Sequence, residues 1–437
     1  MIRICMIGTG YVGLVSGACM ADFGHDVWCV DINAERIAAL KKGVIPFYEP
    51  GLDILVTRNV QADRLRFTTS LAEGMAAADV VFIAVQTPQS ESGEADLQYV
   101  MQVGAEIGRL MTGYKVIVTK STVPVGTARQ LAQVIRQAQP KPLPFALASN
   151  PEFLREGSSI EDFMRPDRVV IGAETEQAAN LVREIYRPLY LLETPIVMCG
   201  IETAELIKYA SNSFLAVKIS FINEIAALAE SVGADVSKIA RSMGLDKRIG
   251  AKFLHAGLGF GGSCLPKDTH ALVHIGQEAG VDMAIVRAAI ARNEELPRRA
   301  FAKAQRLLPP GADTVALLGI TFKPNTDDIR AAASRPLTRL LLDAGLKVRI
   351  TDPVAMPMFR EVFPETVPCE SAYEAASGAQ LCILVTEWNE FRQLDLDRLG
   401  AAMKHKAFLD CRNVYDHARL AAHDFTYDCF GRPAPRG

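Results

Sequence analysis

Residues 1–13 read Met1-Ile2-Arg3-Ile4-Cys5-Met6-Ile7-Gly8-Thr9-Gly10-Tyr11-Val12-Gly13, and this stretch decides the fold of the first part of the chain. The apolar run Ile2–Ile7 predicts a buried strand, and the Gly-x-Gly-x-x-Gly turn after it opens a helical stretch to about Phe23. A second strand is predicted over Asp26–Val30, directly before Asp31. The glycine pattern alone occurs often by chance. A strand before it, a helix after it and an acidic residue about 20 positions on are together typical of a dinucleotide-binding unit.

Each residue of this unit has a physical role. Gly8, Gly10 and Gly13 let the backbone, with Tyr11 and Val12, approach a pyrophosphate at the helix N-terminus. Asp31 can accept hydrogen bonds from the adenosine ribose, and its charge repels a 2′-phosphate, which favours NAD over NADP. The alternative for Asp31 is a cap at the strand end.

Polar residues follow the later strands of the same segment. Predicted strands over 80–85, 115–119 and 145–148 are followed by Thr87, Thr122 and Glu152. Strands that alternate with helices imply a parallel sheet, whose ligands lie beyond the carboxyl ends of the strands. Glu152 and Glu156 are four apart, so on a helical turn they would face the same way, and a carboxylate in a partly desolvated cleft is a natural general base. An exposed Glu/Arg pair is the alternative.

A second sheet is predicted after the break at Pro309-Pro310-Gly311. It begins with a strand over 314–320 and lacks the glycine fingerprint. Lys323, Arg330 and Arg412 follow its strands and suit an anionic group such as a diphosphate. We therefore expect an α/β protein with two Rossmann-like doubly wound parallel-sheet domains, residues 1–200 and 309–437, joined by a helical central domain, residues 201–308.

The central segment carries two candidate catalytic features. A long helix is predicted over 202–232, with Lys208 and Asn212 on one face, where they can stabilise a developing oxyanion. A solvated helix face is the alternative, and for Asn212 alone it is the expected one. A second helical region, from Lys267 to about Leu307, is expected to kink at Pro297, and helices so placed commonly carry dimer contacts.

The other central feature is the glycine-rich stretch from Gly257 to Asp268, which places Cys264 before a helix that starts near Pro266. Positive charge at a helix N-terminus favours a thiolate, so Cys264 is a candidate nucleophile. A buried structural thiol is the alternative.

Composition bounds the remaining possibilities. The 437 residues carry a net charge of -3, which predicts no nucleic-acid partner, and the longest apolar runs are too short to span a membrane. The nine cysteines show no disulfide or zinc spacing. His270 and His274 lack an acidic ligand at matching spacing, so no metal is expected. The N-terminus shows no secretory signal, so we expect a cytoplasmic protein.

The chain resembles the nucleotide-sugar 6-dehydrogenases, the UDP-glucose/GDP-mannose dehydrogenase family, over nearly its whole length. The motifs that carry the resemblance are Gly8–Leu14, Pro46–Gly51, Ser121–Gly126, Asn150–Gly157, Glu205–Tyr209 with Asn212, Gly257–Asp268 and Phe322–Arg330. The resemblance implies a four-electron oxidation of a sugar CH2OH to a carboxylate with two NAD+, through a thiohemiacetal and a thioester on Cys264. UDP-glucose is the implied substrate. GDP-mannose or a UDP-N-acetylhexosamine is the alternative.

The resemblance also implies a role for each matching residue. Lys208 and Asn212 would stabilise the oxygen at C6, Asp268 and Thr122 would position water and protons, and Glu152 or Glu156 would assist hydrolysis. Besides the fingerprint and Asp31, the implied cofactor contacts are Arg36, Thr87, Thr122, Glu156, Lys267 and Arg330. The implied substrate contacts are Glu152, Phe153, Leu154, Arg155, Lys208, Asn212, Arg248, Phe253, Gly257, Lys323 and Arg412, and a homodimer or higher homo-oligomer is implied as well.

Two positions depart from the family pattern. Ala331-Ala332-Ala333 follows Arg330 where Glu and Pro are common, and Gln86 stands where a small residue is expected. Two other functions fit part of the sequence. A two-electron hydroxyacid dehydrogenase needs neither Cys264 nor a third domain, and an NAD-dependent sensor or scaffold leaves Cys264, Lys208 and Asp268 unexplained.

Overall fold

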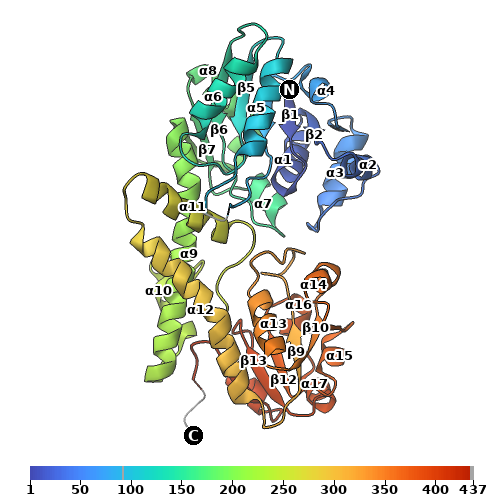
Figure 1. The fold of residues 1–437 in the computed structure, drawn as a ribbon, viewed down its shortest axis with the longest axis vertical. Helices are drawn as coiled ribbons and strands as arrows, with labels where there is room; N and C mark the ends of the chain where they lie inside the picture. The colour runs from blue at the N-terminus through green and yellow to red at the C-terminus, as the bar shows by residue number, and fades with distance from the viewer. Residues whose placement is uncertain (91–92, 434–437) are drawn as a thin grey trace. The chain divides into compact units, whose positions relative to one another are not determined.

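The computed structural model describes residues 1–90 and 93–433, which form two compact units, Met1–Ser211 and Asn212–Gly437. Each unit holds one open sheet with helices against it (Figure 1). The chain is thus an α/β protein with two Rossmann-like sheets and a helical central region.

The sheet of the first unit has the order β3-β2-β1-β4-β5-β6-β7-β8. Its order reverses next to β1, the strand that leads into the glycine turn, as in a doubly wound fold. All of its strand pairs are parallel except β6 with β7, which are antiparallel. The strands are β1 Arg3–Ile7, β2 Asp26–Val30, β3 Leu65–Thr68, β4 Val80–Ile83, β5 Lys115–Thr119, β6 Phe145–Ser149, β7 Val169–Ala173 and β8 Ile196–Cys199.

Helices cover both faces of this sheet and bury their apolar sides against it. In β4 and β5 every side chain is buried, as expected for strands covered on two faces. The helices are α1 Tyr11–Asp22, α2 Ala34–Lys41, α3 Leu52–Gln61, α4 Leu71–Met75, α5 Gln98–Leu110, α6 Thr127–Ala138, α7 Ser159–Met164, α8 Glu176–Ile185 and the 3-10 helix η1 Arg187–Leu192.

The second unit contains the other sheet, with the order β11-β10-β9-β12-β13-β14 and every pair parallel. This repeats the strand order of the first sheet around β1. The strands are β9 Thr314–Leu318, β10 Lys347–Thr351, β11 Val367–Pro368, β12 Leu381–Leu384, β13 Ala407–Asp410 and β14 Thr426–Cys429. Its helices are α13 Ser334–Asp343, α14 Met356–Val362, α15 Ala372–Ala376, α16 Asn389–Arg392, α17 Leu396–Ala402 and α18 His417–Ala421.

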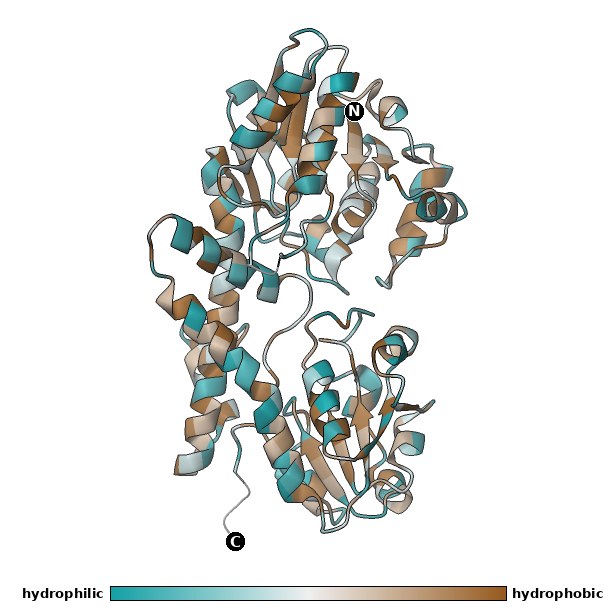
Figure 2. Cartoon of the chain, in the orientation of Figure 1, coloured by the Kyte–Doolittle hydropathy of each residue, from teal (hydrophilic) through white to brown (hydrophobic). Residues whose placement is uncertain are grey.

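The central helices are α9 Ile201–Val232, α10 Val236–Leu245, α11 Leu265–Glu278 and α12 Ala284–Leu307. Residue hydropathy follows this architecture, because the strands are apolar and the helices carry polar residues on their outer faces (Figure 2). Within the described part of the chain, no helix has both the length and the apolar character that crossing a bilayer requires.

One expectation about these elements was wrong. The region from Lys267 to Leu307 is not one helix. It breaks between α11 and α12, where Gly280 takes a left-handed backbone conformation (φ 71°) that ends a helix. Pro297 lies inside α12.

Candidate active site

The glycine turn between β1 and α1 has the geometry of an anion cradle. Gly8 has φ 101°, and a Cβ there would lie 2.5 Å from the carbonyl oxygen of Ala84. A Cβ on Gly13 would lie 2.0 Å from the carbonyl oxygen of Gly8. At Gly10, by contrast, no described atom outside its immediate neighbours lies within 4 Å of such a Cβ, and α1 begins there with no side-chain cap. Open space beside uncapped helix N–H groups fits a pyrophosphate.

Asp31 stands at the end of β2 beside this turn. Its carboxylate accepts hydrogen bonds from the Thr9 N–H and hydroxyl, both at 2.8 Å, and from the Asn33 N–H at 2.9 Å. Arg36 Nη1 lies 3.4 Å from it. Burial opposes the charge, but these donors together hold the pKa of Asp31 below its usual value. The group is therefore an ionised acceptor at neutral pH, suited to a ribose hydroxyl and not to a phosphate.

Thr87 and Thr122, after β4 and β5, lie together. The Thr87 hydroxyl donates to the carbonyl oxygen of Thr122 at 2.9 Å, and Ser121 donates to the carbonyl oxygen of Val85 at 2.5 Å. Two strand-end loops are thereby joined at the carboxyl edge of the sheet. Gln86, the unusual residue directly before Thr87, is exposed.

Glu152 and Lys208 form a buried ion pair within the first unit. Lys208 Nζ lies 2.8 Å from Glu152 Oε1, and the two side chains are only 3% and 5% exposed. Glu152 Oε2 accepts a further hydrogen bond from the Leu154 N–H at 2.6 Å. Burial alone would favour a neutral acid, but Lys208 and this N–H hold the pKa of Glu152 below its usual value. Glu152 is a carboxylate with a fixed direction.

The expected helical turn that would bring Glu152 and Glu156 to one face is absent. Residues 151–155 form neither a helix nor a strand, and α7 starts only at Ser159, because Pro151 and the left-handed Gly157 (φ 77°) interrupt a helix. The exposed Glu/Arg alternative is also wrong for Glu152, since Arg155 pairs with Asp162 instead. The ring of Phe153, the residue after Glu152, lies under the guanidinium of Arg168 and near the ammonium of Lys208.

Lys120 is a buried cation beside this pair that the sequence did not single out. Its ammonium donates to Asn150 Oδ1 at 3.0 Å and to the Tyr186 hydroxyl at 3.3 Å. Burial, reinforced by the charge of Lys208 and opposed by Glu152, lowers the pKa of Lys120 to about 8. The available signal was its place at the carboxyl end of β5, directly before Ser121.

The lowered pKa of Lys120 predicts a specific pH dependence of stability. An unfolded lysine titrates near 10.4. Between about pH 8 and that value the unfolded chain binds the extra proton, so the free energy of unfolding rises with pH. Lys120→Met is expected to remove this rise, up to about 3 kcal/mol. Urea unfolding at about pH 7 and about pH 10 measures it. The exposed Lys41→Met is the control that should keep the rise, and an unaltered rise in Lys120→Met would contradict the assignment.

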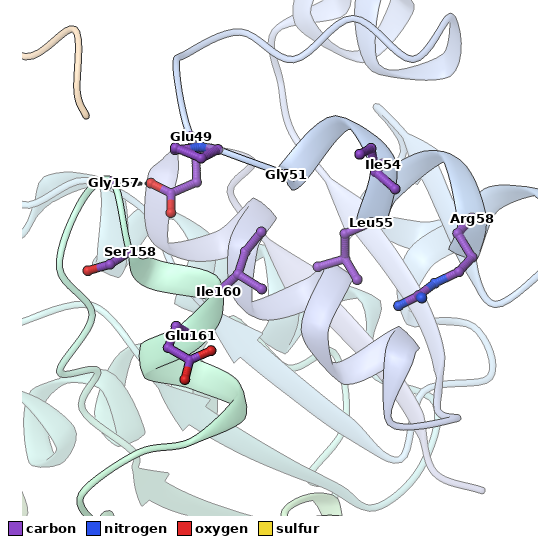
Figure 3. Close-up of a pocket in the computed structure, with 10 residues that line it drawn as sticks. Glu49, Gly51, Ile54, Leu55, Arg58, Gly157, Ser158, Ile160 and Glu161 are labelled. Carbon is purple, nitrogen blue, oxygen red and sulfur yellow. Dashed lines mark hydrogen bonds between the residues drawn. The ribbon is translucent and has the colours of Figure 1, made fainter. Parts of the chain in front are cut away.

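Glu49 is a second residue that sequence reasoning missed, although its motif was noted. Its buried carboxylate accepts hydrogen bonds from the N–H groups of Gly157 at 2.6 Å and Ser159 at 2.8 Å, and from the Tyr11 hydroxyl. It also borders a cavity of about 430 Å3 with Gly157, Ser158 and α3 (Figure 3). Glu49 thus ties the glycine turn to the segment that follows Glu156.

In the second unit, Asp268 receives two donors. Asn212 Nδ2 lies 2.6 Å from Asp268 Oδ2, and Lys267 Nζ lies 2.7 Å from Asp268 Oδ1. Asp268 and Asn212 are 1% and 7% exposed, so the solvated helix face expected for Asn212 alone was wrong. Asn212 lies one turn after Lys208 on α9. Successive turns of α9 therefore each contribute one residue to a polar pair, Lys208 with Glu152 and Asn212 with Asp268.

Cys264 is the N-cap residue of α11, and its carbonyl oxygen accepts from the Asp268 N–H at 2.9 Å. Ser263 Oγ lies 3.6 Å from its sulfur. Seven of the nine cysteines are buried, while Cys199 and Cys264 are partly exposed. The buried-thiol alternative therefore does not describe Cys264.

The basic residues that follow strands of the second sheet differ in how fully their side chains are already bonded to other protein groups. The guanidinium of Arg412 donates to the carbonyl oxygens of Val385 at 2.7 Å and Phe322 at 3.2 Å. Arg330 is exposed and pairs with Asp328 at 2.8 Å. Lys323 is half-buried near the ring of Phe322.

Other predicted contacts lie on loops. Arg248 is exposed and paired with Asp246, Phe253 has φ 66°, and Gly257 packs so closely that a Cβ would lie 2.4 Å from the carbonyl oxygen of Cys411. Ala331, in the departing segment, has φ 47°. A left-handed alanine is strained, and nothing in the structure explains its choice over glycine.

Comparison with known proteins places these residues in a family context. Sequence models of three domains of the UDP-glucose/GDP-mannose dehydrogenase family match: the NAD binding domain over residues 2–190, the central domain over 202–295 and the UDP binding domain over 316–417. The chain is 50% identical to UDP-glucose 6-dehydrogenase of Rhizobium meliloti, covering 99% of this chain and 100% of that protein. It is 44% identical to UDP-glucose 6-dehydrogenase of Bacillus subtilis, covering 100% and 95%. The structure of a UDP-glucose dehydrogenase from Pyrobaculum islandicum matches with a TM-score of 0.91 at 38% identity, covering 99% and 98%.

Proposed function

The chain belongs to the UDP-glucose/GDP-mannose dehydrogenase family, and on that premise we propose that it oxidises UDP-glucose to UDP-glucuronate with two NAD+. The observation that carries the proposal is Cys264 at the start of α11, four residues before an Asp268 that receives Asn212 and Lys267. A two-electron dehydrogenase has no use for that thiol.

The residues around Gly10 and Asp31 fit the dinucleotide. Bound NAD+ supplies the hydride acceptor, once for each of the two oxidations. The uncapped N–H groups of α1 hold the pyrophosphate, and the ionised Asp31 holds the ribose. Thr87, Thr122, Glu156, Lys267 and Arg330 are the further cofactor contacts of the proposal.

The first oxidation removes a hydride and a proton from the C6 alcohol and leaves an aldehyde. The ammonium of Lys208 and the amide of Asn212 donate hydrogen bonds to the C6 oxygen while it is negative. Asp268 and Thr122 position the water that carries the proton away. The buried state of Lys208 and Asn212 supports this role, because donors in a dry site stabilise charge more strongly.

The second oxidation uses Cys264 covalently. Its thiolate attacks the aldehyde carbon, and the resulting thiohemiacetal loses its hydroxyl proton and a hydride to become a thioester. Water then attacks the thioester carbon, which releases the carboxylate and returns the thiol. We assign activation of this water to Glu152, because its lowered pKa keeps it ionised and Lys208 fixes its direction.

The stoichiometry of NADH formation tests the proposal. We expect two NADH per UDP-glucose and a clear preference for UDP-glucose over GDP-mannose and UDP-N-acetylglucosamine. One NADH with a released aldehyde or ketone supports a two-electron dehydrogenase instead. Preference for another nucleotide sugar would reassign the substrate, and NAD binding without turnover would indicate a sensor.

Asp31 sets the choice of cofactor in this proposal. Asp31→Asn is expected to weaken NAD+ binding by about 10-fold, equivalent to one lost charge-assisted hydrogen bond. It is also expected to improve use of NADP+, because Arg36 at 3.4 Å is then released toward a 2′-phosphate. Titration of both cofactors by fluorescence measures the ratio of affinities. An unchanged ratio would remove Asp31 from the ribose site.

A homodimer and a cytoplasmic location complete the proposal. α9 exposes an apolar stripe at helical spacing, made by Phe214, Phe221, Leu228 and Val232, which a second copy would cover. Sedimentation velocity tests the dimer. Cys264 must stay reduced to act as a nucleophile, and the cytoplasm keeps thiols reduced.

A further inference from the structure

The side chain of Asn293 on α12 forms hydrogen bonds to the backbone of the loop that leads to Cys264. We define this loop as residues 257–264 and call it the Cys264 loop. Asn293 Oδ1 accepts from the Phe260 N–H at 2.8 Å, and Asn293 Nδ2 donates to the Phe260 carbonyl oxygen at 2.9 Å. One side-chain amide thus satisfies both polar groups of one backbone residue, as a neighbouring strand would.

Gly259 leaves the space that these two hydrogen bonds between Asn293 and Phe260 require. A Cβ on Gly259 would lie 2.0 Å from Asn293 Oδ1, far inside van der Waals contact, and the residue has φ 77°. The glycine at this position is therefore matched to the asparagine on α12. This accounts for a glycine that neither the cofactor nor the substrate assignments explain.

The loop is held on both sides of Phe260 as well. At its start, Gly257 N–H donates to Oδ1 of the fully buried Asn223 on α9 at 2.9 Å. Near its end, Gly262 N–H donates to the carbonyl oxygen of Arg330 at 2.9 Å. Asn293 fixes the backbone between these two points through its hydrogen bonds to Phe260. A glycine-rich loop is otherwise free to move, because glycine loses the most conformational entropy on ordering.

We propose that Asn293 is a positioning residue for the reaction: its two hydrogen bonds to Phe260 fix the course of the Cys264 loop and thereby the place of the thiol at the start of α11. The inference rests on the proposed function, in which Cys264 must meet an aldehyde carbon at bonding distance. A displacement of about 1 Å at such an atom is able to cost about 100-fold in rate.

The test measures turnover and thiol reactivity in Asn293→Ala. We expect kcat for NADH formation to fall by about 10-fold to 100-fold. The dissociation constant for NAD+ should stay at the wild-type value, because the glycine turn is untouched. Iodoacetamide labelling followed by peptide mass spectrometry gives a second readout, in which the partly exposed Cys199 serves as internal reference. The ratio of Cys264 to Cys199 labelling is expected to rise severalfold as the loop is released.

Two further variants separate positioning from general loss of stability. Gly259→Ala keeps Asn293 but pushes a methyl group into its amide, so it should show the same fall in kcat and the same rise in the labelling ratio. Asn59→Ala removes a different side-chain amide, which is fully buried and bonds to the Leu55 carbonyl oxygen and Arg64, and should leave the ratio unchanged.

The outcomes are distinct. A wild-type labelling ratio or a wild-type kcat in Asn293→Ala would overturn the positioning role. If the wild-type enzyme forms no NADH with any nucleotide sugar, the proposed function fails, while the labelling ratio still decides whether Asn293 controls the Cys264 loop.

Discussion

Cys264→Ala is expected to abolish formation of UDP-glucuronate, with a loss of about 10^4-fold or more, the scale seen when a covalent nucleophile is removed. Without the thiol the aldehyde has no acceptor, so neither thiohemiacetal nor thioester forms. The first hydride transfer does not need the sulfur, and up to one NADH per sugar is the expected residual yield. Product analysis by mass spectrometry together with NADH absorbance measures both quantities.

Two matched variants sharpen this result. Cys264→Ser is expected to stop after the first oxidation or to stall as an ester, because an alkoxide leaves less readily than a thiolate. Cys199→Ala removes the other partly exposed cysteine and should leave the yield at two NADH per sugar. Normal carboxylate formation by Cys264→Ala would exclude the covalent route.

Lys208→Met is expected to lower kcat by about 10^2-fold to 10^3-fold, the range for loss of one oxyanion donor. The substitution also leaves Glu152 buried without its cation, which raises the pKa of that carboxyl and costs about 3–5 kcal/mol of stability. Activity must therefore be compared at a temperature where thermal unfolding shows the variant folded. Steady-state kinetics across pH measure kcat and the acid limb, which we expect to move to higher pH.

The same substitution elsewhere on α9 is the control. Lys218 donates to the backbone carbonyl oxygen of Ile249 at 3.0 Å, and no carboxylate of the described residues pairs with it, so Lys218→Met should keep kcat within about twofold. A Lys208→Met enzyme with normal kcat and an unmoved acid limb would remove both the oxyanion role and the coupling to Glu152.

The parts of the fold that sequence predicted well are those set by local chemistry. The Gly8 turn, the strand ends at Asp31 and Thr122, the long helix through Lys208 and the second sheet without a fingerprint are all encoded within short windows. Apolar runs and glycine or proline breaks suffice for these. The cap position of Cys264 also follows from its neighbours, because Pro266 defines where a helix begins.

The contacts that sequence reasoning missed join residues far apart in the chain. Glu152 pairs with Lys208, which lies 56 positions away in the chain, and Asn212 donates a hydrogen bond to Asp268 at the same sequence separation. The buried side chain of Asn212 has the distant Asp268 carboxylate as its partner. The local helix pattern does not contain this partner, so on its own it predicts that Asn212 is exposed to solvent. Lys120 and Glu49 were overlooked because a lone charged residue near a strand or turn carries no pattern until its partners are known.

Brief exposure of the wild-type protein to UDP-glucose and NAD+, followed by acid quenching and peptide mass spectrometry, tests the central claim most directly. We predict a sugar-nucleotide adduct on the peptide that contains Cys264, with the mass of a thioester, which appears and decays as the second NADH is formed. Formation of two NADH per sugar with the Cys264 peptide unmodified at every time point would contradict it.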